Sequence, residues 1–121
     1  DDVISRYPVD TNRVYITGLS MGGIGAWYFA IKCPNRFAAL APVAFRGDGW
    51  SPCGIKHLPV WAFHGAQDQI IPLAKAEELA SEFKRCGGSM KFTVYPDRGH
   101  DAWTFAYNNS ELYTWLLQHR K

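Results

Sequence analysis

One stretch near the N-terminus constrains the fold more than any other: a short apolar run passes through a glycine-bracketed serine into a longer apolar run. Residues 14–17 (VYIT) are β-branched or aromatic and predict a short buried strand. Residues 21–32 are almost uniformly apolar and too many for a normal strand, so they predict a buried helix that ends before Pro34. A strand that leads so directly into a helix is typical of α/β proteins.

The rest of the chain continues this alternation, with Gly and Pro between the elements. Further strands are expected over residues 37–43, 59–64 and 90–95. Between residues 73 and 83 apolar side chains recur every three or four positions, which predicts an amphipathic helix that follows Pro72 and ends at Gly87-Gly88. Asn108, three residues before Glu111, is expected to cap a last helix.

This order of elements predicts the fold class. Strands that alternate with helices imply right-handed crossovers and a mostly parallel sheet with helices on both faces. The near-continuous apolar strands agree, because such strands are buried on both sides. The length of 121 residues fits one domain, so we expect a single α/β domain over residues 1–121 with about four strands.

Composition and charge exclude several classes of protein. Hydrophobic residues make up 47% and charged residues 20% of the chain, which excludes disordered and fibrous proteins. No apolar run approaches the about 20 residues that span a bilayer. The net charge of +2 is too small to favour nucleic acid or an anionic membrane, so a small molecule is the expected partner. No signal-peptide pattern opens the sequence, and both a cytoplasmic and a processed secreted protein fit it.

The three cysteines do not predict a shared structural site. Cys33, Cys53 and Cys86 are odd in number and widely spaced, which excludes a framework of disulfides that includes all three, and no C-x-x-C pair indicates zinc. Free cysteine packs as a small hydrophobic residue, so three half-buried thiols are the expected state. One bridge, between Cys33 and Cys53, is the alternative.

The segment from Gly18 to Gly22 (GLSMG) carries the first chemical signal. It matches G-x-S-x-G with a predicted strand before it and a predicted helix after it, the context of a nucleophile elbow. Such a turn strains the backbone of Ser20 and leaves little room beside it, which explains the two glycines. The Ser20 hydroxyl would stand at the start of a helix, and the amide of Met21 would point to a developing oxyanion.

A serine nucleophile needs a base, and four histidines compete for that role. His100 lies in a loop after the last strand, which is where the base falls if the chain order is Ser, acid, His. His119 is expected to face solvent and His57 to lie on the surface. His64 ends a strand, and a buried ring that donates to a backbone carbonyl is its expected state.

The orienting acid is expected at Asp68. It follows the strand over residues 59–64, at the carboxyl side of the sheet, where the ligand-binding loops of α/β proteins gather. Asp97 follows Pro96 and resembles a turn residue. Asp101 adjoins the base, so its side chain would point elsewhere, and Asp48 lies in a glycine-rich loop.

Three segments together resemble the α/β-hydrolase superfamily. They are residues 14–23 (VYITGLSMGG), residues 64–68 (HGAQD) with Ile71-Pro72, and residues 99–103 (GHDAW). The resemblance is to the C-terminal portion of that fold, in the branch of esterases, feruloyl esterases and polyhydroxybutyrate depolymerases that includes predicted peptidases. It implies a carboxylic-ester hydrolase in which Ser20 forms an acyl-enzyme, His100 acts as base and acid, and Asp68 orients His100. It implies no metal ion and no organic cofactor.

The chain departs from that family before the elbow strand. Family members carry further strands there and take a second oxyanion donor from an early loop, whereas only residues 1–12 precede the strand here. We therefore expect an open sheet edge along residues 14–17. Three explanations compete: a fragment of a longer esterase, a compact hydrolase that forms a homodimer through this edge, or a non-catalytic module that retains the triad.

The substrate is less constrained than the reaction. A peptidase or thioesterase of the same fold is the alternative to an esterase. Trp50, Trp103 and the loop over residues 46–53 are candidates for the substrate pocket, and plain packing or a surface loop explains them equally well.

Overall fold

The computed structural model describes residues 5–121, and within them the chain alternates between strands and helices. Their order is β1 (Tyr15–Leu19), α2 (Met21–Lys32), β2 (Ala39–Val43), the 3-10 helix η1 (Pro52–Ile55), β3 (Val60–Gly65), α3 (Leu73–Arg85), β4 (Met90–Tyr95), α4 (Trp103–Tyr107) and α5 (Ser110–Leu117). The strands form one sheet in the order β1-β2-β3-β4, and each neighbouring pair is parallel. The expected α/β class is confirmed.

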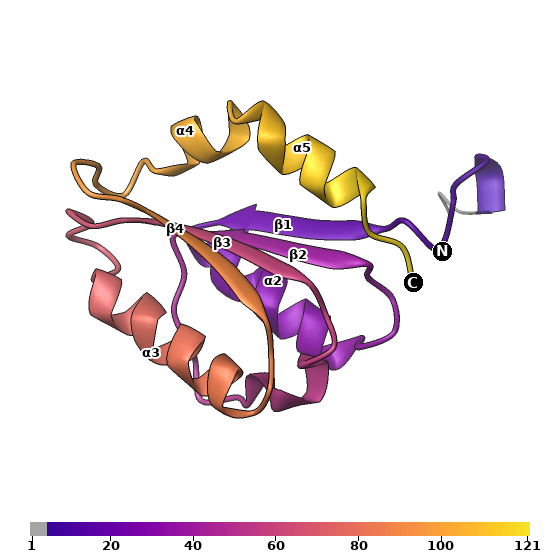
Figure 1. Ribbon diagram of the computed structural model, residues 1–121, viewed down its shortest axis with the longest axis horizontal. Coiled ribbons are helices and arrows are strands. Elements are labelled where there is room, and N and C mark those ends of the chain that lie inside the picture. The colour runs from indigo at the N-terminus through magenta and orange to yellow at the C-terminus, as the bar shows by residue number, and fades with distance from the viewer. Residues whose placement is uncertain (1–4) are drawn as a thin grey trace.

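Helices cover both faces of this sheet (Figure 1): α2 and α3 lie on one face, and α4 and α5 lie on the other. Successive side chains of a strand point to opposite faces, so each strand supplies both cores. Leu40 and Ala62 pack in the core on the α2 and α3 side, whereas Ala41 and Phe63 pack in the core on the α4 and α5 side. Trp27 of α2 is fully buried in the first core.

The carboxyl ends of the strands meet at one edge of the sheet. Leu19 pairs with Val43, Val43 pairs with Phe63, and Gly65 pairs with Tyr95, each within two residues of the end of its strand. The segments that follow β1, β3 and β4 therefore leave the sheet side by side. This register brings distant parts of the sequence to a common site.

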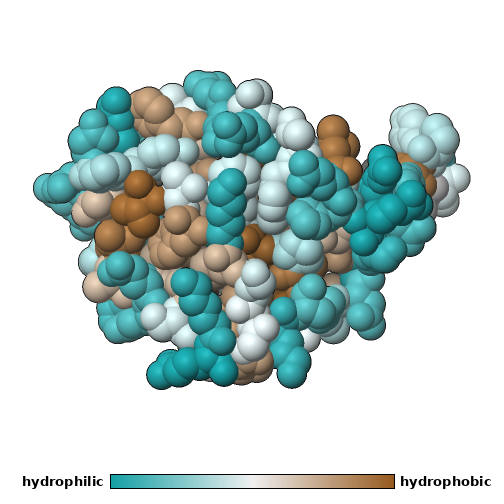
Figure 2. Space-filling model, viewed as in Figure 1, coloured by the Kyte–Doolittle hydropathy of each residue, from teal (hydrophilic) through white to brown (hydrophobic). Residues whose placement is uncertain are grey.

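The two outer strands differ in their surroundings. β1 pairs only with β2 among the described residues, which agrees with the open edge expected there. β4 forms the opposite edge, and Val94 on it is partly exposed. Figure 2 shows apolar atoms on the face where β4 lies in Figure 1, between the more hydrophilic surfaces of the helices.

Most expected element boundaries agree with the structure, and the exceptions are local. The last helix is capped by Asn109, whose side chain accepts from the Glu111 amide, and not by Asn108 as the capping-box pattern predicted. The two asparagines are adjacent, so the pattern fixed the cap only to within one residue. The short helices η1 and α4 were not expected, because four or five residues carry too little periodicity to predict.

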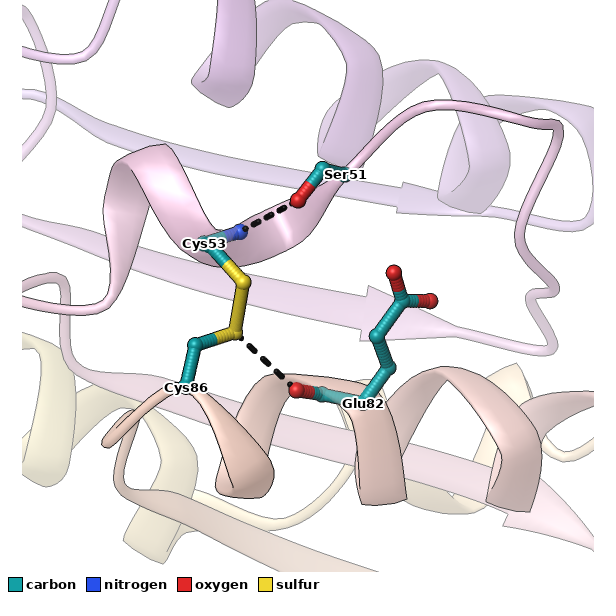
Figure 3. The surroundings of a disulfide bond; sticks show 4 residues. All are labelled: Ser51, Cys53, Glu82 and Cys86. Atoms are coloured by element: carbon teal, nitrogen blue, oxygen red, sulfur yellow. Dashed lines mark hydrogen bonds between the residues drawn. A yellow bond between two sulfur atoms is a disulfide. The ribbon is translucent and has the colours of Figure 1, made fainter.

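The expected state of the cysteines was wrong. Cys53 and Cys86 form a disulfide, with their Cα atoms 5.5 Å apart, and Cys33 is a free, exposed thiol at the end of α2. Figure 3 shows that the bridge joins η1 to the end of α3. The Cys86 Sγ also lies 3.0 Å from the carbonyl oxygen of Glu82, a contact and not a hydrogen bond, because a disulfide sulfur carries no proton.

Candidate active site

Ser20 occupies a sharp turn between β1 and α2. Its φ of 57° and ψ of −121° lie in a region that side-chain-bearing residues rarely adopt. The turn is held by a hydrogen bond from the Ser20 amide to the carbonyl oxygen of Val43, 2.9 Å long. A Cβ on Gly18 would lie 2.1 Å from the Gly22 carbonyl oxygen, so glycine is required at position 18 as expected.

The second glycine requirement falls on Gly23 and not on Gly22. A Cβ at position 22 would meet nothing within 4 Å, whereas one at position 23 would stand 2.8 Å from the carbonyl oxygen of Val43. Gly23 thus allows the first turn of α2 to pack against the end of β2. The G-x-S-x-G pattern had assigned the second requirement to Gly22, and only the packing of α2 shows that Gly23 carries it.

His100 lies within hydrogen-bond distance of Ser20. The distance from Ser20 Oγ to His100 Nε2 is 2.8 Å, and both residues are half-buried. His100 Nδ1 lies 2.7 Å from Asp68 Oδ2 on its other side. An ionised carboxylate can only accept, so Nδ1 carries the proton and Nε2 is free to accept the hydroxyl proton of Ser20.

Asp68 is fixed by its own loop. The residue is buried, at 6% exposure, and its Oδ1 accepts from the amides of Ile70 and Ile71, both at 2.8 Å. Burial raises the pKa of Asp68, but the hydrogen bonds from His100, Ile71 and Ile70 outweigh it and hold the pKa below its ordinary value of 3.8. The carboxylate is therefore charged at neutral pH, with Oδ2 directed to His100.

The loop after β3, which carries Asp68, is bonded to the loop after β4, which carries His100. The Ala66 amide donates to the carbonyl oxygen of Tyr95, and the Gln67 amide donates to that of Arg98. These bonds are 2.9 Å and 2.8 Å long. The acid and the base are thus positioned by paired backbone as well as by their own hydrogen bond.

The other carboxylates considered for the acid role pair elsewhere. Asp48 lies 3.3 Å from Arg46, and Asp97 lies 3.8 Å from Arg98 on the surface. Asp101 is exposed and bonds through its backbone oxygen to the amide of Thr104. Asp68 is the acid that the structure brings to His100.

The remaining histidines fall into three environments. His57 is exposed, as expected, with Nε2 3.1 Å from the carbonyl oxygen of Pro34. His119 was expected to face solvent, but it is half-buried, and its ring lies edge-on to Trp115 with centroids 4.7 Å apart. His119 follows the end of α5, and its carbonyl oxygen accepts from the Tyr15 hydroxyl of β1 over 2.9 Å, a long-range contact that periodicity alone did not reveal. His64 is fully buried, and its Nε2 lies 2.7 Å from a backbone carbonyl oxygen as expected.

Met21 begins α2, and its side chain is 83% exposed. The first amides of a helix have no partner within the helix and carry the positive end of its dipole. The amide of Met21 is therefore suited to bind negative charge beside Ser20, and its role as an oxyanion donor stays a prediction.

The two tryptophans proposed for a substrate pocket have different surroundings. Trp103 packs edge-on against His100, with ring centroids 5.2 Å apart. Trp50 stacks on Trp27 and lines a cavity of about 620 Å³ between the loop that follows β2 and α3. Neither Ser20 nor His100 lines that cavity. Contact of either tryptophan with a substrate stays a prediction.

Residues 5–121 lack the features of two other kinds of site. No group of three or more His, Cys, Asp or Glu side chains in this range is arranged to hold a metal ion. No helix in the same range combines the length and the apolarity that crossing a membrane requires.

Comparison with known proteins gives consistent matches. The model of the dienelactone hydrolase family matches residues 2–114. A bifunctional acetylxylan esterase/xylanase of Neocallimastix patriciarum is 27% identical over 119 residues, and feruloyl esterase D of Neurospora crassa is 33% identical over 82. The crystal structure of a thermostable esterase matches with a TM-score of 0.92 and 33% identity over 99% of this chain.

The matches cover this chain more fully than they cover its relatives. The alignments include 95% and 66% of this chain, but 17% of the acetylxylan esterase/xylanase and 28% of the feruloyl esterase. The chain spans 34% of the thermostable esterase.

Proposed function

Because the chain belongs to the dienelactone hydrolase family, we propose that it carries the catalytic residues of a carboxylic-ester hydrolase that acts through an acyl-enzyme. Two hydrogen bonds support the proposal: Ser20 Oγ to His100 Nε2 at 2.8 Å, and His100 Nδ1 to Asp68 Oδ2 at 2.7 Å. The names of the relatives suggest acetyl and feruloyl esters as the first substrates to test.

In the first half-reaction Ser20 Oγ attacks the ester carbonyl carbon while His100 Nε2 takes the hydroxyl proton. The carbonyl oxygen becomes an oxyanion near the amide of Met21 at the start of α2. Asp68 holds His100 in the tautomer with a free Nε2 and stabilises the imidazolium that forms. When the tetrahedral intermediate collapses, His100 returns the proton to the leaving alcohol and the acyl group remains on Ser20.

In the second half-reaction water replaces the alcohol. His100 takes a proton from the water, the resulting oxygen nucleophile attacks the acyl carbon, and the acid product leaves as Ser20 regains its proton. One amide donor at an oxyanion hole contributes roughly 100- to 1,000-fold in turnover, so a second donor beside Met21 would raise the rate further. We propose that this second oxyanion donor lies in the part of the fold that the relatives contain and this chain does not span.

Labelling of Ser20 by a fluorophosphonate tests the proposal directly. The reagent reacts with serines that are activated by a neighbouring base, so the chain is expected to be labelled at Ser20 and to lose labelling in Ser20→Ala. Ser81→Ala is the matched control, because Ser81 is an exposed serine on α3. Hydrolysis of p-nitrophenyl acetate should follow the same pattern. A chain that is neither labelled nor hydrolytic would overturn the proposal.

A further inference from the structure

His64 is a buried titratable side chain that the proposed mechanism does not use. It lies near the end of β3, four residues before Asp68, and its side chain is fully buried. A buried imidazole has to satisfy both ring nitrogens or leave a polar atom unpaired at a cost of about 1–3 kcal/mol. The partners of those nitrogens therefore show what His64 does.

The ring nitrogens of His64 face two different elements. The amide of Phe45, just beyond β2, donates to His64 Nδ1 over 3.3 Å, so Nδ1 carries no proton. In the neutral ring the proton then lies on Nε2, which is 2.7 Å from the carbonyl oxygen of Ile71. The same Nε2 lies 3.5 Å from Asp68 Oδ2, the oxygen that accepts from His100.

Ile71 is consequently held from both sides. Its amide donates to Asp68 Oδ1, and its carbonyl oxygen accepts from His64. The segment from Asp68 to Ile71 is thereby closed on itself and tied to the end of β3. A rotation of the Asp68 carboxylate that moved Oδ2 away from His100 would break the backbone hydrogen bonds to Oδ1. It would also move Oδ2 away from the N–H of His64.

We propose that His64 is a positioning residue, which fixes the loop over residues 68–71 so that Asp68 Oδ2 is directed to His100. The effect of this role on catalysis rests on the proposed function, whereas the fixing of the loop is a property of the folded chain. An apolar side chain of similar size would fill the same space between Phe45 and Ile71 and supply neither hydrogen bond.

Two substitutions separate the two nitrogens. His64→Gln can keep a donor near the position of Nε2, whereas His64→Asn can keep an acceptor near Nδ1 but loses the donor to Ile71. The readout is the low-field proton NMR signal of the His100 Nδ1–H in its hydrogen bond with Asp68. We expect this signal to persist in His64→Gln and to exchange with water about tenfold faster in His64→Asn, as the loss of one hydrogen bond predicts.

A measurement on the unmodified chain guards against variants that fail to fold. Nitrogen-15 NMR of the imidazoles at neutral pH should show the His64 proton on Nε2 and none on Nδ1. A proton on Nδ1, or unchanged exchange of the His100 proton in a folded His64→Asn variant, would overturn the proposal and leave His64 as packing.

Turnover gives a separate readout. If the proposed function holds, His64→Asn should lower kcat by up to about 100-fold, the cost of a misplacement of about 1 Å, with KM unchanged. If the proposed function is wrong, the wild-type chain will show neither turnover nor labelling of Ser20, but the NMR measurements will still test the role of His64. The two failures are therefore distinguishable.

Discussion

Gly65 lies directly against Gly99. A Cβ on Gly65 would stand 2.2 Å from the carbonyl oxygen of Gly99 and 2.5 Å from that of Arg98. Gly65 is the last residue of β3, and Gly99 precedes His100. The absence of a side chain at position 65 therefore lets the loop that carries His100 approach the loop that carries Asp68.

Gly65→Ala is expected to separate these loops. The added methyl group has no room against the backbone, so we expect a loss of about 1–3 kcal/mol in the free energy of unfolding, the usual cost of overpacking. We also expect slower fluorophosphonate labelling of Ser20, since His100 would move away from Asp68. Urea denaturation and labelling kinetics measure the two effects.

Gly25→Ala is the matched control for this substitution. Gly25 lies inside α2, and a Cβ there would meet nothing within 4 Å. The exchange should stabilise the helix by up to about 1 kcal/mol, because alanine favours helices over glycine. A Gly65→Ala variant as stable and as reactive as the wild type would show that the two loops separate freely.

Asp68→Asn should abolish activation while preserving the fold. The amides of Ile70 and Ile71 donate to Oδ1, so an asparagine at this position would keep its oxygen there and turn its NH₂ group to His100. His100 would then carry its proton on Nε2 and could not accept from Ser20. The corresponding change in serine proteases costs about 10⁴ in turnover.

Ester hydrolysis with an unfolding curve for each protein measures this effect. A loss below tenfold with the fold intact would exclude Asp68 as the orienting acid, and Asp97 and Asp101 would be the next carboxylates to replace.

The sequence predicted the parts of the molecule that local chemistry determines. The bounds of α2 agree with the structure because the glycine-bracketed Ser20 begins it and Pro34 prevents its continuation. Ser20, Asp68 and His100 were predicted from their places after strands and from the chain order Ser, acid, His. These signals depend mainly on a few neighbouring residues, so they can be recognised in the sequence without knowledge of the fold.

Contacts between distant loops were not predictable in the same way. The partner of Cys53 depends on where η1 and the end of α3 meet, and neither position is encoded near the cysteines. The proximity of His64 to Asp68 likewise depends on how the loop after β3 folds back. The sequence predicted that His64 donates to a backbone carbonyl oxygen, but it did not identify Ile71 as the residue that carries this oxygen.

Loss of the disulfide should destabilise the chain without moving the candidate catalytic residues. Cys53 and Cys86 are 33 residues apart, and closing a loop of that size is worth about 3–4 kcal/mol by the chain-entropy model. We expect a loss of that size in the free energy of unfolding when both are replaced by serine, measured by urea denaturation.

Cys33→Ser provides the control, because Cys33 is exposed and free, and it should change stability by less than about 0.5 kcal/mol. Equal stability of the double variant and the wild type would mean that the bridge does not form in solution.

Acidification should destabilise the folded chain through two buried groups. Burial lowers the pKa of His64 below 6.5 despite the bond to Ile71 and the charge of Asp68, which raise it; the charges of His100 and Glu77 act in opposite directions. The pKa of Asp68 is also lowered in the folded chain. Both groups thus bind protons more readily in the unfolded chain, and both favour unfolding as pH falls.

The two groups act in successive pH ranges. The contribution of His64 is complete above pH 6.5 and declines as pH falls below that value, whereas that of Asp68 declines only as pH falls below its ordinary pKa of 3.8. Urea denaturation between pH 8 and pH 5 should therefore show a decrease in the free energy of unfolding below pH 6.5. Its slope should be at most about 1.4 kcal/mol per pH unit for one proton. His64→Gln removes the titrating ring, so its curve should be flatter in this range; an identical slope in the variant would show that His64 does not contribute.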